Sequence, residues 1–228
     1  MRVFIAALAL GAALPGQALA HRAPPAIAMD AQADAEQLIG ILLSQESIAE
    51  LGGRAFDYGV SQGEVADPKL RKLYDANPGM KEYVASKVRP EFQVILTGAL
   101  PQLRHDLSAI VLDEMTPDEI ADTLTFFASP TGVKMKAQIY RSIGDKPDQT
   151  QAEMQQSAVA SAMATLTPDD YPALLAFGQS SAAQKMQAVT PKISAAGQQW
   201  AEQMIAANGD RLQQVAVKAQ AEFLAKKK

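Results

Sequence analysis

Two short segments of the sequence repeat each other at a fixed spacing. Thr116-Pro117-Asp118-Glu119 is followed 51 residues later by Thr167-Pro168-Asp169-Asp170. The agreement continues at the same spacing, because Leu124, Phe126, Ser129, Lys134 and Met135 recur as Leu175, Phe177, Ser180, Lys185 and Met186. A repeat of this kind predicts two related units, each of which must pack against a neighbour to bury its apolar face.

Each repeated segment has the chemistry of a helix start. A threonine side chain can cap the first free amides, and a proline at the first helical position costs no hydrogen bond. An acid three residues after the threonine, Glu119 or Asp170, can complete a capping box. Ser129-Pro130 then has the pattern of a second helix start. Each unit is therefore predicted to be a short helix, a tight corner and a longer helix.

The remainder of the chain also favours helices. Apolar residues recur at helical spacing from Leu38 onward, and no convincing run of alternating residues predicts a strand. Pro90 and Pro101 are each expected to begin or kink a helix, and Asn208-Gly209 is expected to end one. We therefore predict an all-α fold, a helical array that contains two related helix–corner–helix hairpin units.

Residues 1–20 have the pattern of a secretory signal peptide. A positive start precedes an apolar run from Val3 to Leu14, and Ala18-Leu19-Ala20 supplies a cleavage site. The chain lacks cysteine, and export without disulfides fits a bacterial periplasm. We expect a periplasmic protein cleaved near Ala20; a retained amino-terminal anchor is the alternative. No later stretch is long and apolar enough to predict a transmembrane helix.

The mature chain is predicted to have four parts. A flexible leader at 21–30 precedes an amino-terminal helical region at 31–89. The first repeated unit occupies 90–146, and a degenerate second unit with a carboxy-terminal helix occupies 147–228. Whether these parts make one domain or two stays open at this point, although hairpins that share a continuous core favour one.

The first unit resembles a known family. Its pattern is a threonine-led acidic cap, an aromatic pair and a Ser-Pro-x-Gly corner followed by a lysine, made by Thr116, Pro117, Asp118, Glu119, Phe126, Phe127, Ser129, Pro130, Gly132 and Lys134. This pattern is similar to domain-of-unknown-function family 2059 over about residues 90–143. The resemblance implies an exported bacterial helical protein and transfers no catalytic residue.

The second copy, over about residues 163–195, departs from that pattern. It retains Thr167, Pro168, Asp169 and Asp170. The aromatic pair and the corner change, because Phe127, Pro130 and Gly132 are replaced by Gly178, Ser181 and Ala183. The second copy is therefore a degenerate relative of the first.

The composition leaves few residues for catalysis or metal binding. The histidines are His21 and His105. His21 would become the amino terminus after cleavage and could chelate copper together with His105, but two histidines on a helical chain supply too few ligands for us to favour such a site. An acidic cluster contains Asp113, Glu114, Asp118, Glu119 and Asp122. Helix capping and solvation explain these residues better than acid–base catalysis or calcium binding does. We predict no catalytic residue, no cofactor and no metal.

The charge and the last helix bear on partners. A net charge of −4 argues against a nucleic-acid-binding protein. The apolar stripe of the last helix, which ends in lysines, is Leu212, Val215, Ala219 and Phe223. Such a helix can lie on a membrane surface or dock on the core, and we favour docking.

These observations lead to a ranked set of functions. We expect an exported, non-enzymatic helical protein that acts as a protein–protein interaction module in the bacterial envelope, with an envelope protein as its partner. The alternative is a periplasmic carrier of a lipid or another apolar ligand, which requires a cavity between the hairpins. A third is a hydrolase, which requires a pocket in which the acids of Asp113 to Asp122 converge.

Overall fold

A computed structural model describes residues 25–145, 160–161 and 164–226, and these residues form an all-α array without strands. In chain order the elements are α1 (Pro25–Leu42), α2 (Gln45–Ala66), α3 (Pro68–Asp75), α4 (Met80–Glu114), α5 (Pro117–Ala128), α6 (Pro130–Asp145), the 3-10 turn η2 (Pro168–Asp170), α8 (Tyr171–Gly178) and α9 (Ser181–Lys226). The predicted fold class is confirmed. The expected signal peptide at residues 1–20 lies outside the described residues.

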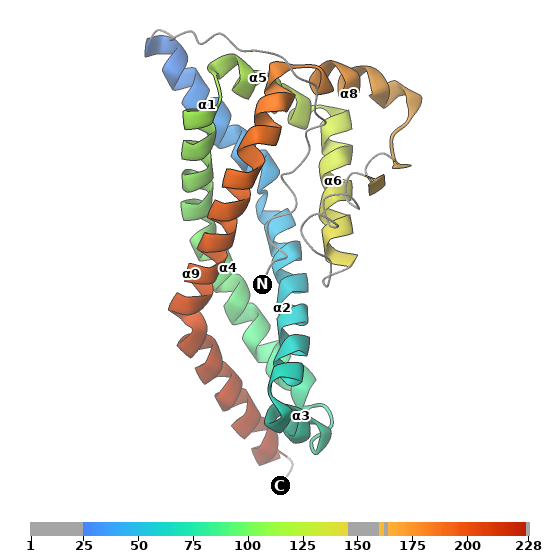
Figure 1. The fold of residues 1–228 in the computed structure, drawn as a ribbon. Coiled ribbons are helices and arrows are strands. Elements are labelled where there is room, and N and C mark those ends of the chain that lie inside the picture. The colour runs from blue at the N-terminus through green and yellow to red at the C-terminus, as the bar shows by residue number, and fades with distance from the viewer. Residues whose placement is uncertain (1–24, 146–159, 162–163, 227–228) are drawn as a thin grey trace.

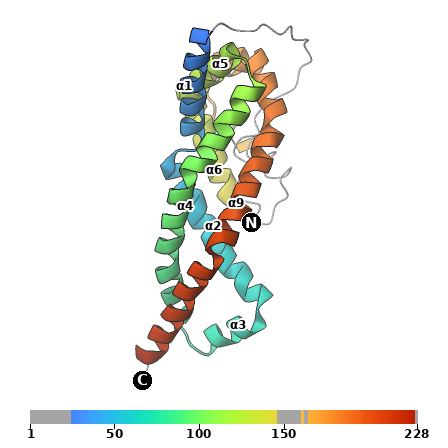
Figure 2. The same ribbon diagram turned by 90° about the vertical axis from the view of Figure 1, so that its left-hand side faces the viewer.

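The two longest helices, α4 and α9, pack side by side and run the length of an elongated molecule (Figure 1). At one end, α1 and α5 pack on each other, and α8 lies at the same end. The other end holds α3, the start of α4 and the last turns of α9, and Figure 2 shows α3 set apart from the end of α9. No described helix is long and apolar enough to cross a membrane.

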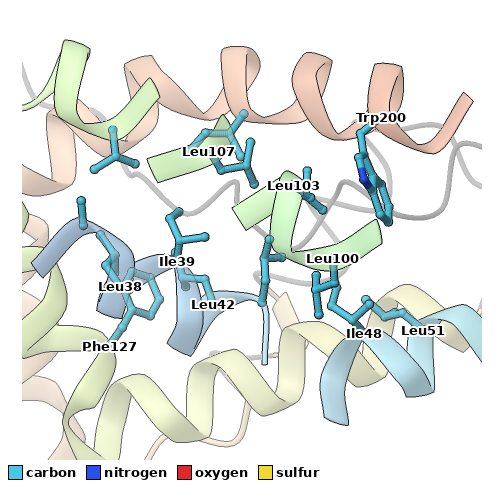
Figure 3. Close-up of a cluster of buried hydrophobic side chains, with 14 of the residues drawn as sticks. Leu38, Ile39, Leu42, Ile48, Leu51, Leu100, Leu103, Leu107, Phe127 and Trp200 are labelled. Carbon is cyan, nitrogen blue, oxygen red and sulfur yellow. The ribbon is translucent and has the colours of Figure 1, made fainter. Parts of the chain in front are cut away.

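The main core fills the first of these ends. Side chains from six of the helices meet there. Among them are Leu38 and Ile39 of α1, Ile48 of α2, Leu103 and Leu107 of α4, Phe127 of α5, Ile139 of α6 and Trp200 of α9, most of which Figure 3 shows. The Trp200 indole N–H donates to the carbonyl oxygen of Ala99 at 3.2 Å, which satisfies its one polar atom as it packs on α4.

A second, smaller cluster lies at the α3 end. Met80, Val84 and Val88 of α4 pack there against Ala219 of α9, and Phe223 covers them. The apolar stripe of the last helix therefore docks on the protein itself, as the sequence analysis favours.

Two expected helix boundaries are wrong. The helix α1 begins at Pro25, inside the expected leader, because proline is compatible with a first helical turn and Ala31 and Ala35 are buried. The helix α9 passes through Asn208-Gly209 without ending. The Asn208 side chain donates to the Met204 carbonyl oxygen at 2.8 Å instead of capping the helix.

The helix α4 also crosses the expected boundary between residues 89 and 90. Pro90 and Pro101 both lie inside it with exposed side chains, so each ring faces solvent rather than the core. The amino-terminal region and the first unit therefore share one helix, just as the second unit and the carboxy-terminal helix share α9.

Candidate functional site

A partly enclosed cavity of about 330 Å³ lies between α2, α3, α4 and α9. It separates the main core from the smaller cluster. Phe92 and Met204 of the main core line one part of it, and Val84 and Val88 of the smaller cluster line another. The volume is more than twice that of the engineered cavity of about 150 Å³ that stays dry and binds benzene. The space therefore has the size of a small-molecule site.

Two glycines of α2 keep part of the cavity open. Gly59 and Gly63 line it, and a Cβ atom added to either would meet no atom within 4 Å. A glycine inside a helix costs about 0.5–1 kcal/mol relative to alanine. By contrast, a Cβ on Gly52 would lie 2.2 Å from the Leu96 side chain, so that glycine is required for packing. Packing does not require Gly59 and Gly63.

The cavity is apolar at one end and carries its polar groups at the other. Along α4 the lining runs from Lys81 to Phe92, a rise of about 16 Å at 1.5 Å per residue. Phe56 of α2 packs against Phe92, with ring centroids 5.7 Å apart. Tyr74 of α3 lies with Lys81 at the polar end.

The polar end holds an ion pair beside a phenol. The Lys81 Nζ lies 2.5 Å from the Oε1 of Glu64. The hydrogen bond from Lys81 to Glu64 raises the pKa of the lysine, which keeps it charged. Burial raises the pKa of Tyr74 above its ordinary value. Tyr74 and Lys81 line the cavity, and Glu64 is held beside them by its ion pair with Lys81.

The short helix α3 is placed over this end by cap residues that the sequence indicates. Asp67 caps it, because its carboxylate accepts from the amides of Lys69 at 2.9 Å and Leu70 at 3.3 Å. After α3 the chain turns at Gly79, whose φ of 85° suits glycine, and enters α4. Leu70 and Tyr74 thereby face the cavity.

The repeated motif has a structural role at the opposite end. Thr116 caps α5 and forms the predicted capping box with Glu119. The Glu119 amide donates to the threonine hydroxyl at 3.3 Å, and the Thr116 amide donates to the Glu119 carboxylate at 2.9 Å. In the second segment, the Asp170 carboxylate accepts from the Thr167 amide at 3.0 Å. Pro117 and Pro168 take the first helical positions, and Asp118 and Asp169 are exposed.

The two corners have matching hydrogen bonds. The Ser129 hydroxyl donates to the Phe126 carbonyl oxygen at 2.6 Å and accepts from the Gly132 amide at 3.1 Å. Ser180 makes the same pair of bonds, to Phe177 at 2.7 Å and from the Ala183 amide at 3.2 Å. Pro130 begins α6 after the first corner. That the two segments are copies of one unit stays a prediction.

A shallow groove lies where the two corners meet. It is lined by Asp122, Thr125, Phe126 and Ser129, together with the residues 51 positions later, Ala173, Ala176, Phe177 and Ser180. Phe126 stacks on Phe177, with centroids 4.1 Å apart and planes 4° apart, and Phe127 meets the same ring edge-on. The aromatic residues of the motif therefore join the two segments.

A charged link also joins them. The Asp170 carboxylate accepts from the Thr131 hydroxyl at 2.9 Å and from the Lys134 ammonium at 2.9 Å. Its hydrogen bond from the Thr167 amide, and then those from Lys134 and Thr131, hold the pKa of Asp170 well below its usual range. This carboxylate therefore has a structural role, because its hydrogen bonds hold the two segments together.

The acidic cluster does not converge on one point. Glu114 forms an ion pair with Lys192 of α9, and this pair lowers the pKa of the glutamate. The Glu119 carboxylate accepts the hydrogen bond from the Thr116 amide that closes the capping box. Among the described residues no group of three histidine or acidic side chains could hold a metal ion, and His105 is exposed. His21 lies outside the described residues.

The sequence patterns do not predict this cavity. The expected place for an apolar cavity was between the hairpins, whereas the observed one lies between α2, α3, α4 and α9. One signal was present: Gly59 and Gly63 are four residues apart in a helix, which places both on one face.

Comparisons with known proteins give no relative. No family model matches the chain, and neither a curated protein nor a solved structure gives a significant match. The resemblance to family 2059 therefore stays a prediction.

Proposed function

We propose that this protein is a carrier that binds an apolar ligand in the cavity between α2, α3, α4 and α9. The observation that carries the proposal is the cavity itself, about 330 Å³ with a mostly apolar lining. Binding sites for small molecules are commonly apolar clefts of about 300–1,000 Å³ with a few polar groups. The signal-peptide pattern supports the bacterial periplasm as the place where the carrier works.

The position of the cavity supports reversible binding. It lies between two apolar clusters. The side chains of Phe92 and Val84 have no packing partner on their cavity side, and a ligand chain would supply those van der Waals contacts. The helix α3 covers it with half-buried side chains, and none of the described residues of α3 is fully buried. A cover held by few buried contacts can open at low cost in free energy.

Filling the cavity tests the proposal. Binding of a fluorescent apolar probe would be measured with the delipidated mature protein and with Gly63→Leu, whose side chain would enter the open space. We expect at least a tenfold loss of affinity, or about 1.4 kcal/mol. Gly98→Leu is the matched control, because Gly98 is also a helical glycine with open space around its Cβ but does not line the cavity.

Two results decide the outcome. Loss of probe binding in Gly63→Leu with an unchanged or raised Tm, and unchanged binding in Gly98→Leu, support the carrier. Equal probe affinity in both variants and the parent protein would contradict it. Binding to an envelope protein, the first expectation of the sequence analysis, stays a prediction that affinity capture from an envelope extract can test.

A further inference from the structure

The cavity has the polarity of an amphiphile site. Its polar lining side chains, Lys81 and Tyr74, lie at the α3 end, and the lining toward Phe92 and Met204 is apolar. A ligand with one polar end and one long apolar part would match this distribution along the cavity axis. A ligand that is apolar throughout would leave the Lys81 ammonium beside hydrocarbon, which is unfavourable.

The polar end offers hydrogen-bond donors. The Lys81 ammonium carries three N–H groups, and its pairing with Glu64 leaves others free to bind a ligand. The Tyr74 hydroxyl, which also has a hydrogen bond with Gln220, is a further donor because a phenol is protonated at neutral pH. Both groups therefore suit an acceptor on the ligand, and the charge of Lys81 favours an anionic one.

Glu64 holds the lysine in place. Its Oε1 is buried, and the Lys81 ammonium 2.5 Å away compensates for that burial. The side chain of Glu64 is 20% exposed and that of Lys81 is 37% exposed, which leaves the ammonium the more accessible partner. A ligand head that arrives from solvent meets the cation first.

We propose that the ligand is a single-chain fatty acid, with its carboxylate bound by Lys81 and Tyr74 and its chain directed toward Phe92. This inference rests on the proposed function, because it names the ligand class of the same cavity. The distance of about 16 Å along α4 from Lys81 to Phe92 accommodates an extended chain of medium length.

The test compares three ligands that share one alkyl chain and differ in the head group. Dodecanoic acid, dodecanol and dodecylamine would each compete with the fluorescent apolar probe for the mature protein. We expect the acid to bind at least tenfold more tightly than the alcohol, equal to about 1.4 kcal/mol, and the amine to bind most weakly. Tyr74→Phe should reduce the preference for the acid.

A double variant separates the head group from the chain. Lys81→Met alone would leave Glu64 buried without a partner, so Lys81→Met/Glu64→Gln removes both charges at once. In this variant the preference for the acid over the alcohol should fall to the part that Tyr74 supplies, with alcohol affinity unchanged. Lys87→Met is the control, since Lys87 is an exposed lysine of α4 that does not line the cavity.

The two levels of the proposal fail in different ways. If acid and alcohol bind the parent protein equally, or if the amine binds best, the carboxylate inference is wrong and the carrier stands. If the double variant keeps the full preference for the acid, Lys81 is not the group that binds it. If none of the three ligands displaces the probe, the carrier proposal fails as well.

Discussion

The ring of Phe126 lies flat against the ring of Phe177, the residue 51 positions later in the chain, with centroids 4.1 Å apart. The groove around this pair is lined by four residues and their four counterparts at that same spacing. The contact therefore joins equivalent positions of the two repeated segments. That the segments are copies of one unit stays a prediction.

The stacked pair should couple energetically. A double-mutant cycle of Phe126→Leu and Phe177→Leu, measured by urea unfolding, should give a coupling free energy of about 0.5–1.5 kcal/mol. The control cycle pairs Phe126→Leu with Phe56→Leu, because Phe56 packs on Phe92 instead, and its two effects should add within about 0.5 kcal/mol. Additive effects at Phe126 and Phe177 would contradict a direct contact.

The first corner should not tolerate a side chain at Gly132. A Cβ there would lie 2.1 Å from the Phe126 carbonyl oxygen, a backbone atom that cannot move without displacing α5. Gly132→Ala should lower the free energy of unfolding by about 1–3 kcal/mol in urea denaturation. Gly98→Ala is the control, because the space around Gly98 is open, and it should raise the free energy of unfolding by about 0.5–1 kcal/mol. An unchanged free energy of unfolding in Gly132→Ala would mean that the backbone of Phe126 does not press on this position.

Asp170 should make stability depend on acid pH. Its hydrogen bonds from Thr167, Lys134 and Thr131 depress the folded-state pKa, so the stabilisation is present above the unfolded value of about 3.9 and is lost as pH falls toward the folded value. Asp170→Asn should therefore lower Tm at pH 7 by a few degrees, and the difference from the parent protein should narrow below pH 4.

The matched control for Asp170→Asn is the same substitution at the neighbouring residue, Asp169. Asp169→Asn changes an exposed carboxylate in the same turn and should leave Tm close to that of the parent at every pH. Thermal unfolding followed by circular dichroism across this pH range measures both variants. A Tm difference for Asp170→Asn that stays constant into acid would exclude the ionised carboxylate as the cause.

Local interactions are what the sequence reveals best. The capping box of Thr116 and Glu119 spans four residues, so the atoms that form it are already close in the chain and the pattern is sufficient to predict it. The same holds for Asp67 before α3. The stop expected at Asn208-Gly209 failed for the opposite reason, because burial of the distant Ala219 and Phe223 against α4 stabilises the helix beyond it.

The cavity could not be predicted from local pattern. Its walls come from residues as far apart as Phe56 and Met204, and a void is defined by which side chains do not meet. The spacing of Gly59 and Gly63 shows only that one face of α2 lacks side chains. Whether another helix fills that face depends on how α4 and α9 cross, which tertiary packing decides.

The last turns of α9 should be held to the protein by Tyr83. Its hydroxyl donates to the Glu222 carboxylate at 3.0 Å and accepts from the Lys226 ammonium at 3.1 Å, while its ring lies 5.7 Å from that of Phe223. Tyr83→Phe should lower the free energy of unfolding by about 0.5–1.5 kcal/mol. Tyr83→Ala should lower the free energy of unfolding by about a further 0.5–1.5 kcal/mol, because it also removes the aromatic contact with Phe223.

Hydrogen exchange of the last turns of α9 checks this directly. Amide exchange at residues 219–226 should accelerate in Tyr83→Ala, because the contacts that dock the helix end are removed. Lys87→Ala, which removes a cation 5.4 Å from the same ring on the exposed side, should leave exchange unchanged. In flotation with anionic vesicles the parent protein should stay unbound, since its apolar stripe is already covered. Vesicle binding by the parent as strong as by Tyr83→Ala would mean that the stripe serves a membrane rather than the core.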